Sequence, residues 1–92
     1  MIMVTQKAKQ HIKEMLAAKS CSPNIGMRLI LKPSTGRFAL KFDKERESDQ
    51  VVRHHGSKVL LIDEKIVSSC SGLLTIDFGG TGAFPHFLIV RR

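Results

Sequence analysis

The sequence predicts an α+β domain in which one N-terminal helix lies beside a mostly antiparallel sheet. Two observations favour this fold class. Apolar residues recur at helical spacing up to about residue 19, and from Met27 onward they alternate with polar residues, as in half-buried strands. The chain of 92 residues contains no internal repeat and no linker-like stretch, so we expect a single domain over residues 1–92.

The first expected element is an amphipathic helix near residues 5–19. Thr5 is a suitable N-cap because its hydroxyl can accept hydrogen bonds from backbone N–H groups two or three residues further on. Pro23 cannot continue a helix, so the element must end before it. The residues at helical spacing on the expected buried face are Ala8, Ile12, Met15 and Leu16.

A β-hairpin is expected next, with its turn at residues 34–36, where Ser-Thr-Gly follows a proline. A one-residue slip would turn a whole face to solvent, so Phe38, Leu40 and Phe42 should be buried together. The mixed-charge run at residues 43–50 is typical of a solvated loop. The apolar residues that alternate in the two strands are Met27, Leu29, Leu31, Phe38, Leu40 and Phe42.

Four further strands and one short helix complete the expected fold. Asp63 is placed to cap the short helix, which would run through Ile66 and Val67. The glycine-rich residues 79–82 indicate a turn and not a phosphate-binding loop, because no Lys-Ser/Thr pair and no helical pattern follow them. The strands are expected at residues 51–53, 58–62, 73–78 and 87–90.

The composition indicates a soluble cytoplasmic protein. No stretch approaches the roughly 18 apolar residues of a membrane span, and polar residues from Gln6 onward interrupt any secretory signal. The formal charge of +7 is compatible with an acidic partner, but acidic residues dilute the basic ones, so nucleic acid is not favoured. The basic residues that could form a patch are Lys41, Lys44, Arg46, Arg53, Arg91 and Arg92.

No set of residues in the sequence indicates an enzyme, a metal site or a cofactor. An acid, a base and a nucleophile at matched spacing are not found. Cys21 and Cys70 belong to no Cys-x-x-Cys pair and fit ordinary thiols of a reducing compartment. His54 and His55 should face opposite sides of a strand, so a metal site would need His86 or Cys70 to converge with one of them. We therefore expect no catalytic, cofactor-binding or metal-ligating residue.

Several segments, taken in order, resemble the HesB-like, or A-type iron–sulfur carrier, family. The Val-Thr lead and the apolar helix after it resemble the start of that family. The Gly-Met-Arg-Leu strand running to Lys-Pro-Ser, and the returning aromatic-x-Leu-x-Phe strand, resemble its first hairpin. The resemblance implies the family's fold, with a flattened barrel or sandwich of strands beside the helix. The matching segments are residues 4–16, 26–34, 38–43, 58–63 and 76–78.

The sequence departs from that family at its ligand positions. The resemblance implies one ligand cysteine in the turn after the first main strand and a Cys-Gly-Cys pair near the C-terminus, which bind iron or an iron–sulfur cluster. Here residues 32–37 read Lys-Pro-Ser-Thr-Gly-Arg, and residues 87–92 contain no cysteine. The hydroxyls of Ser34 and Thr35 are poor substitutes for thiolates. Cys21 and Cys70 match no ligand position of the family.

Three hypotheses of function follow. The first is a non-enzymatic HesB-like domain, related to iron–sulfur biogenesis, that binds a protein partner. The second is a basic module for nucleic acid or an acidic protein surface, and steep salt dependence would distinguish phosphate binding. The third, an enzyme that uses Cys70, lacks a neighbouring base in the sequence. A homodimer is also expected, because an apolar strand near the C-terminus offers an edge for pairing at Phe84, Phe87, Leu88 and Ile89.

Overall fold

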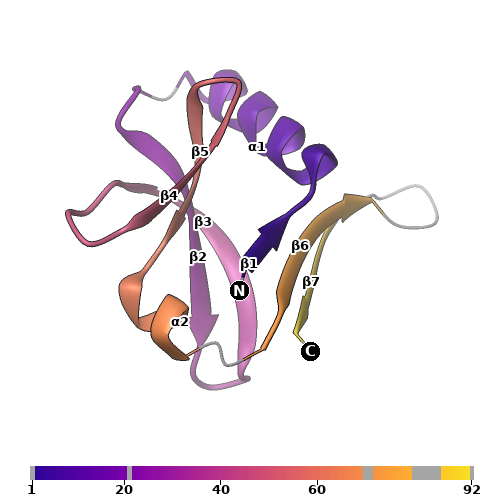
Figure 1. Ribbon diagram of the computed structural model, residues 1–92. Coiled ribbons are helices and arrows are strands. Elements are labelled where there is room, and N and C mark those ends of the chain that lie inside the picture. The colour runs from indigo at the N-terminus through magenta and orange to yellow at the C-terminus, as the bar shows by residue number, and fades with distance from the viewer. Residues whose placement is uncertain (1, 21, 70–71, 80–85, 92) are drawn as a thin grey trace.

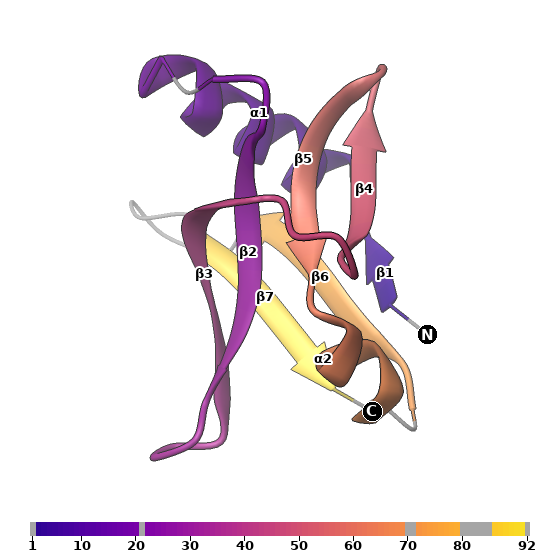
Figure 2. The same ribbon diagram turned by 90° about the vertical axis from the view of Figure 1, so that its left-hand side faces the viewer.

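One long helix, α1 (Gln6–Ala18), packs against two β-sheets in the computed structural model of the chain (Figure 1). The structure describes residues 2–20, 22–69, 72–79 and 86–91. A short second helix, α2 (Glu64–Ser69), lies at the opposite end of the molecule from α1 (Figures 1 and 2). The predicted α+β class with one main helix is confirmed.

The strands form a larger sheet with the order β3-β2-β5-β4 and a smaller sheet with the order β1-β6-β7. Figure 2 shows β6 and β7 crossing obliquely behind the larger sheet. Each strand predicted after the hairpin is found to within one residue at either end. The strands are β1 (Ile2–Val4), β2 (Ile25–Lys32), β3 (Arg37–Lys44), β4 (Gln50–His54), β5 (Ser57–Ile62), β6 (Leu74–Gly79) and β7 (His86–Arg91).

Strand pairing is mostly antiparallel, as predicted, through β2–β3, β4–β5 and β6–β7. Two pairings, β1–β6 and β2–β5, are parallel and were not predicted. These pairs join strands far apart in the sequence, so no local turn signals them. The described strands form two separate sheets and no closed barrel, which corrects the barrel form of the implied fold.

Helix α1 begins and buries its apolar face as the sequence predicts. The Thr5 hydroxyl accepts a hydrogen bond from the backbone N–H of Ala8 at 3.2 Å and donates one to Oδ1 of Asp77 on β6 at 2.6 Å. The bond from Thr5, followed by one from the backbone N–H of Phe78, lowers the pKa of Asp77. Thr5 therefore caps the helix and ties its start to the smaller sheet. The residues of α1 that are buried are Ala8, Ile12 and Leu16.

The core lies where the apolar face of α1 meets both sheets. Burial of its aliphatic side chains supplies the main driving force for folding, because apolar surface leaves water. Since α1 contributes to one cluster that includes strands of both sheets, the helix joins the two layers. The buried residues of this cluster are Ala8, Ile12, Leu16, Met27, Leu29, Val59, Leu60, Ile62, Leu74 and Ile76.

The predicted hairpin is present, and its register places the two alternating faces opposite each other. Phe38, Leu40 and Phe42 pack against the core, but each stays partly exposed because β3 is the edge strand of its sheet. Leu31 is 42% exposed because the hairpin extends past the core towards its turn. The predicted apolar face therefore does point towards the core, but its side chains are less buried than predicted at this edge of the sheet.

Arg28 forms a buried ion network that the sequence did not reveal. Its side chain is 3% exposed, and its Nη2 atom lies 2.6 Å from Oδ2 of Asp49, whose side chain is 1% exposed. Its Nε atom lies 2.6 Å from Oδ2 of Asp43. These bonds raise the pKa of Arg28 and lower the pKa values of Asp49 and Asp43. Residues 43–50 are thus not simply a solvated loop, because Asp49 anchors the segment to β2.

The short helix α2 begins where Asp63 was expected to cap it. Oδ1 of Asp63 accepts a hydrogen bond from the backbone N–H of Lys65 at 2.7 Å. The Asp63 carbonyl also accepts from the backbone N–H groups of Ile66 and Val67. Side-chain and backbone acceptors together satisfy N–H groups of the first turn, which have no partner within a helix.

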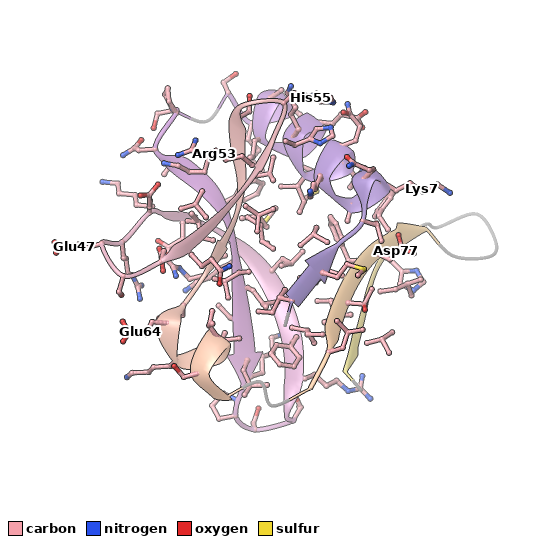
Figure 3. All side chains as sticks on the ribbon, in the orientation of Figure 1. Lys7, Glu47, Arg53, His55, Glu64 and Asp77 are labelled. Atoms are coloured by element: carbon pink, nitrogen blue, oxygen red, sulfur yellow. The ribbon has the colours of Figure 1, made fainter. Side chains whose placement is uncertain are left out.

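Replacing the buried carboxylate of Asp49 tests the importance of the Arg28 network. We expect Asp49→Asn to lower the free energy of unfolding by roughly 2 to 4 kcal/mol, because the buried charge of Arg28 then has only the carboxylate of Asp43 to balance it. The control is Glu47→Gln in the same loop, which removes an exposed charge (Figure 3) and should change stability by less than about 0.5 kcal/mol. Urea unfolding measures both variants, and equal small effects would contradict the network's role.

Candidate functional site

The turn between β2 and β3 occupies the place where the family resemblance implies a ligand cysteine. Its backbone N–H groups at Thr35 and Gly36 both donate to the carbonyl of Lys32, at 3.3 and 2.8 Å. The Thr35 hydroxyl accepts from the backbone N–H of Arg37 at 3.3 Å. Gly36 has φ of 69°, a left-handed conformation that glycine adopts without strain. The Thr35 hydroxyl and the backbone of this turn are therefore engaged in holding its shape.

The two adjacent histidines lie at the tip of the β4–β5 hairpin beside α1 (Figure 3). His54 is 7% exposed, and its Nε2 atom lies 3.0 Å from Oε1 of Gln10 on α1. In the tautomer whose Nε2 atom carries the proton, His54 donates to this amide oxygen. The ring centroids of His54 and His55 are 4.1 Å apart, contrary to the expectation of opposite faces. His55 has φ of 51° in the turn, so strand alternation does not apply to it.

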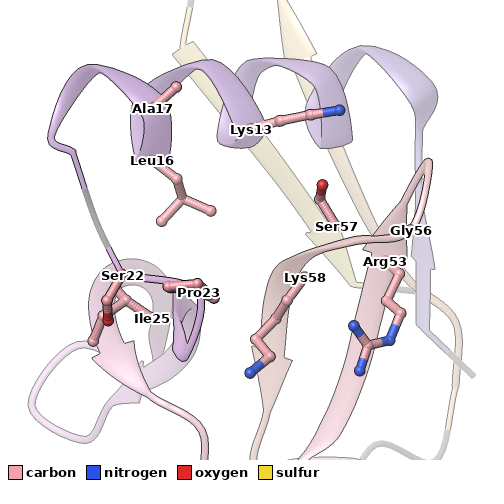
Figure 4. Close-up of a pocket in the computed structure, with 10 residues that line it drawn as sticks. All are labelled: Lys13, Leu16, Ala17, Ser22, Pro23, Ile25, Arg53, Gly56, Ser57 and Lys58. Atoms are coloured by element: carbon pink, nitrogen blue, oxygen red, sulfur yellow. The ribbon is translucent and has the colours of Figure 1, made fainter.

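A cleft of about 490 Å³ opens between α1, the connection from α1 to β2, and the β4–β5 hairpin (Figure 4). Lys13, Leu16 and Ala17 contribute from α1, at the i, i+3 and i+4 spacing that places side chains on one helix face. In Figure 4 Leu16 points from the helix towards the space between Pro23 and Lys58. A cleft of this size accommodates a few side chains of a partner or a small ligand.

Basic side chains surround this cleft. Nζ of Lys58 lies 2.6 Å from Oε1 of Glu45, so its charge is already paired. Lys13 and Arg53 form no ion pair within the described ranges. Burial, followed by electrostatic repulsion from His55, Lys13 and Lys9, lowers the pKa of His54. The local potential is therefore positive, and the hairpin favours the neutral form of His54.

The other residues singled out in the sequence do not join this cleft. Arg46 lies within 3.4 Å of Asp43 and 4.0 Å of Asp63, so acidic neighbours compensate part of the expected basic patch. Gly79 ends β6 with φ of 152°, whereas the rest of the glycine-rich turn lies outside the described residues. Cys21, Cys70, Phe84 and Arg92 also lie outside them, and no group of three or more metal-binding side chains is found in the described part of the chain.

The chain resembles known proteins in three-dimensional structure. No protein-family model matches it, and no curated protein does either. Escherichia coli SufA, involved in biosynthesis of iron–sulfur clusters, aligns with a TM-score of 0.69 and 24% identity, over 98% of this chain and 84% of SufA. The chain has the HesB-like fold of the A-type iron–sulfur carriers.

Two further structures show the same fold. A protein from Aquifex aeolicus aligns with a TM-score of 0.66 and 25% identity, over 99% of this chain and 91% of its own. IscA, solved with a 2Fe–2S cluster, aligns with a TM-score of 0.65 and 12% identity, over 99% of this chain and 85% of IscA. In each case most of both chains is covered, so the structural similarity is not confined to the hairpin.

The described residues do not fit the iron–sulfur cluster that the fold implies. Clusters are held by soft thiolate ligands, whereas the β2–β3 turn offers hydroxyls and strand β7 contains no cysteine. The donor chemistry of the described fold therefore differs from that of a cluster carrier.

The cleft was not identified from the sequence. In the sequence, Arg53 is one of several dispersed basic residues, and no motif distinguishes Lys13 from the other lysines. Their convergence depends on how the β4–β5 hairpin packs on α1, which brings together residues 40 positions apart in the chain. The helical spacing of Lys13, Leu16 and Ala17 was the one local signal available, and it does not specify the facing hairpin.

The lowered pKa of His54 predicts a pH dependence of stability. The folded state binds its proton less readily than the unfolded state, whose pKa is near 6.5, so stability is full above that pH and falls as pH decreases through the folded pKa. We expect His54→Gln to reduce the loss of unfolding free energy between about pH 7.5 and pH 5. His86→Gln, at an exposed histidine, is the control, and identical pH profiles for His54→Gln and the original chain would contradict the assignment.

Proposed function

We propose that this chain is a non-enzymatic, cytoplasmic binding domain related to iron–sulfur biogenesis proteins, which acts through a protein partner and carries no cluster itself. The supporting observation is the combination of a HesB-like fold with a β2–β3 turn made of Pro, Ser, Thr and Gly at the implied ligand position. In that turn the Thr35 hydroxyl already bonds to the backbone. Function depends on the site that a fold presents, so the same fold can serve a different role.

The chemistry of the donor set supports a role without a cluster. Cysteine thiolates are the usual ligands of such clusters, typically about four per cluster. The sequence contains two cysteines in total, and neither matches a ligand position of the resembled family. A partner-binding role fits the open cleft beside α1, whose basic and apolar lining is suited to recognition. No helix among the described residues has the length and apolar character needed to cross a membrane.

Anaerobic reconstitution with ferrous iron and sulfide tests the proposed absence of a cluster. We expect no visible-range cluster absorption above that of a Cys21→Ser/Cys70→Ser double variant, because the chain lacks a convergent thiolate set. IscA, solved with a 2Fe–2S cluster, is the positive control in the same preparation. Stoichiometric absorption in this chain that the double variant loses would overturn the proposal.

Strand β7 supports the proposed homodimer, because it is an edge strand with an apolar outer face. Leu88 and Val90 are 36% and 49% exposed, whereas Phe87 and Ile89 pack on the core. Multi-angle light scattering should give a dimer mass at high concentration, and Leu88→Lys should return the monomer mass. Leu31→Lys, an equally exposed site on the other sheet, should leave the mass unchanged. A monomer mass for the original chain would reject this interface.

A further inference from the structure

The cleft beside α1 contains two cations without a described partner. Lys13 extends from helix α1, and Arg53 belongs to strand β4 (Figure 4). The third cation of the lining, Lys58, is paired with Glu45 at 2.6 Å and is 13% exposed. A basic group beside a carboxylate forms a charge-assisted hydrogen bond, which is stronger than a bond between neutral groups. Lys13 and Arg53 are therefore available to receive acidic groups from outside the domain.

Beside these cations the cleft presents apolar surface (Figure 4). Leu16 and Ala17 come from α1, and Pro23 and Ile25 come from the connection to β2 and the start of that strand. Ala17 and Pro23 are exposed, and Ile25 is half-buried. An apolar side chain placed on this surface would leave water and gain in free energy. The cleft thus combines an apolar floor with a positive rim.

We infer that this cleft binds a short acidic segment of a protein partner that also carries apolar side chains. The inference rests on the proposed partner-binding function and names the chemistry of the partner. Carboxylates of the segment would pair with Lys13 and Arg53, while its apolar side chains lie against Leu16 and Pro23. Complementary charge of this kind mainly sets specificity and the rate of association, and the apolar contact slows dissociation.

A protein segment fits the cleft better than a nucleic acid does. Nucleic-acid surfaces combine many phosphate contacts with aromatic side chains on which bases stack. The described residues that line this cleft include no aromatic side chain, and two of its three cations are unpaired. A phosphodiester backbone also carries no apolar side chain that could pack against the apolar floor of the cleft.

The direct test measures the affinity of the full chain for a fluorescent peptide of about eight residues that alternates glutamate with leucine, a length suited to a cleft of this size. We expect saturable binding that weakens roughly tenfold or more in a Lys13→Glu/Arg53→Glu variant, because both rim charges then repel the peptide. The control is a Lys41→Glu/Lys65→Glu variant, which has the same net charge as the Lys13→Glu/Arg53→Glu variant. It changes exposed lysines away from the cleft, so it should bind the peptide as the original chain does. Thermal unfolding of each variant checks that it is folded.

Peptide and oligonucleotide comparisons decide between the possible ligands. Replacing glutamate by glutamine, or leucine by serine, should each weaken binding, because the rim and the floor both contribute. An oligo-dT of matched charge that binds more tightly, and whose binding the Lys13/Arg53 variant abolishes, would overturn the inference in favour of nucleic acid. Equal loss in both double variants would also overturn it, as would no binding of the peptide. These failures would leave untouched the cluster experiment, and with it the proposed absence of a cluster.

Discussion

The apolar face of α1 is the constraint on which the arrangement of both sheets depends. Ala8 and Ile12 are fully buried and belong to a core cluster that also contains Leu29 of the larger sheet and Leu74 of the smaller one. Removing a buried aliphatic side chain from such a cluster costs both transfer free energy and cavity formation. Because one helix face contacts two layers, the position of α1 determines where those layers meet.

The same helix links the core to the candidate site. At its start, the Thr5 hydroxyl caps α1 and bonds to Asp77, which fixes the helix on β6. Near its other end, Leu16 belongs to the core and also lines the cleft. Beside it, the hydrogen bond between His54 and Gln10 ties the β4–β5 hairpin to α1. The cleft therefore has walls held by the packing of the fold, whereas the β2–β3 turn extends beyond the core.

Local signals predicted the elements, and contacts distant in sequence explain what was missed. The helix near residues 5–19 was predictable because capping by Thr5 and the apolar spacing agree. The burial of Arg28 was not, since its partner Asp49 lies 21 residues away in a run whose composition is that of a loop. The parallel pairing of β1 with β6 has no turn that could reveal it. For the same reason, no pattern in the sequence brings Lys13 and Arg53 to one cleft.

An NMR titration of the isotope-labelled chain with the alternating glutamate–leucine peptide tests most directly whether recognition has its site beside α1. We expect backbone amide resonances to shift for the segments that line the cleft, residues 13–17, 22–25 and 53–58, and to stay unchanged in the β2–β3 turn. Shifts confined to residues 32–37 and to β7 would contradict it, because they would place recognition where the fold's relatives are implied to hold their ligands.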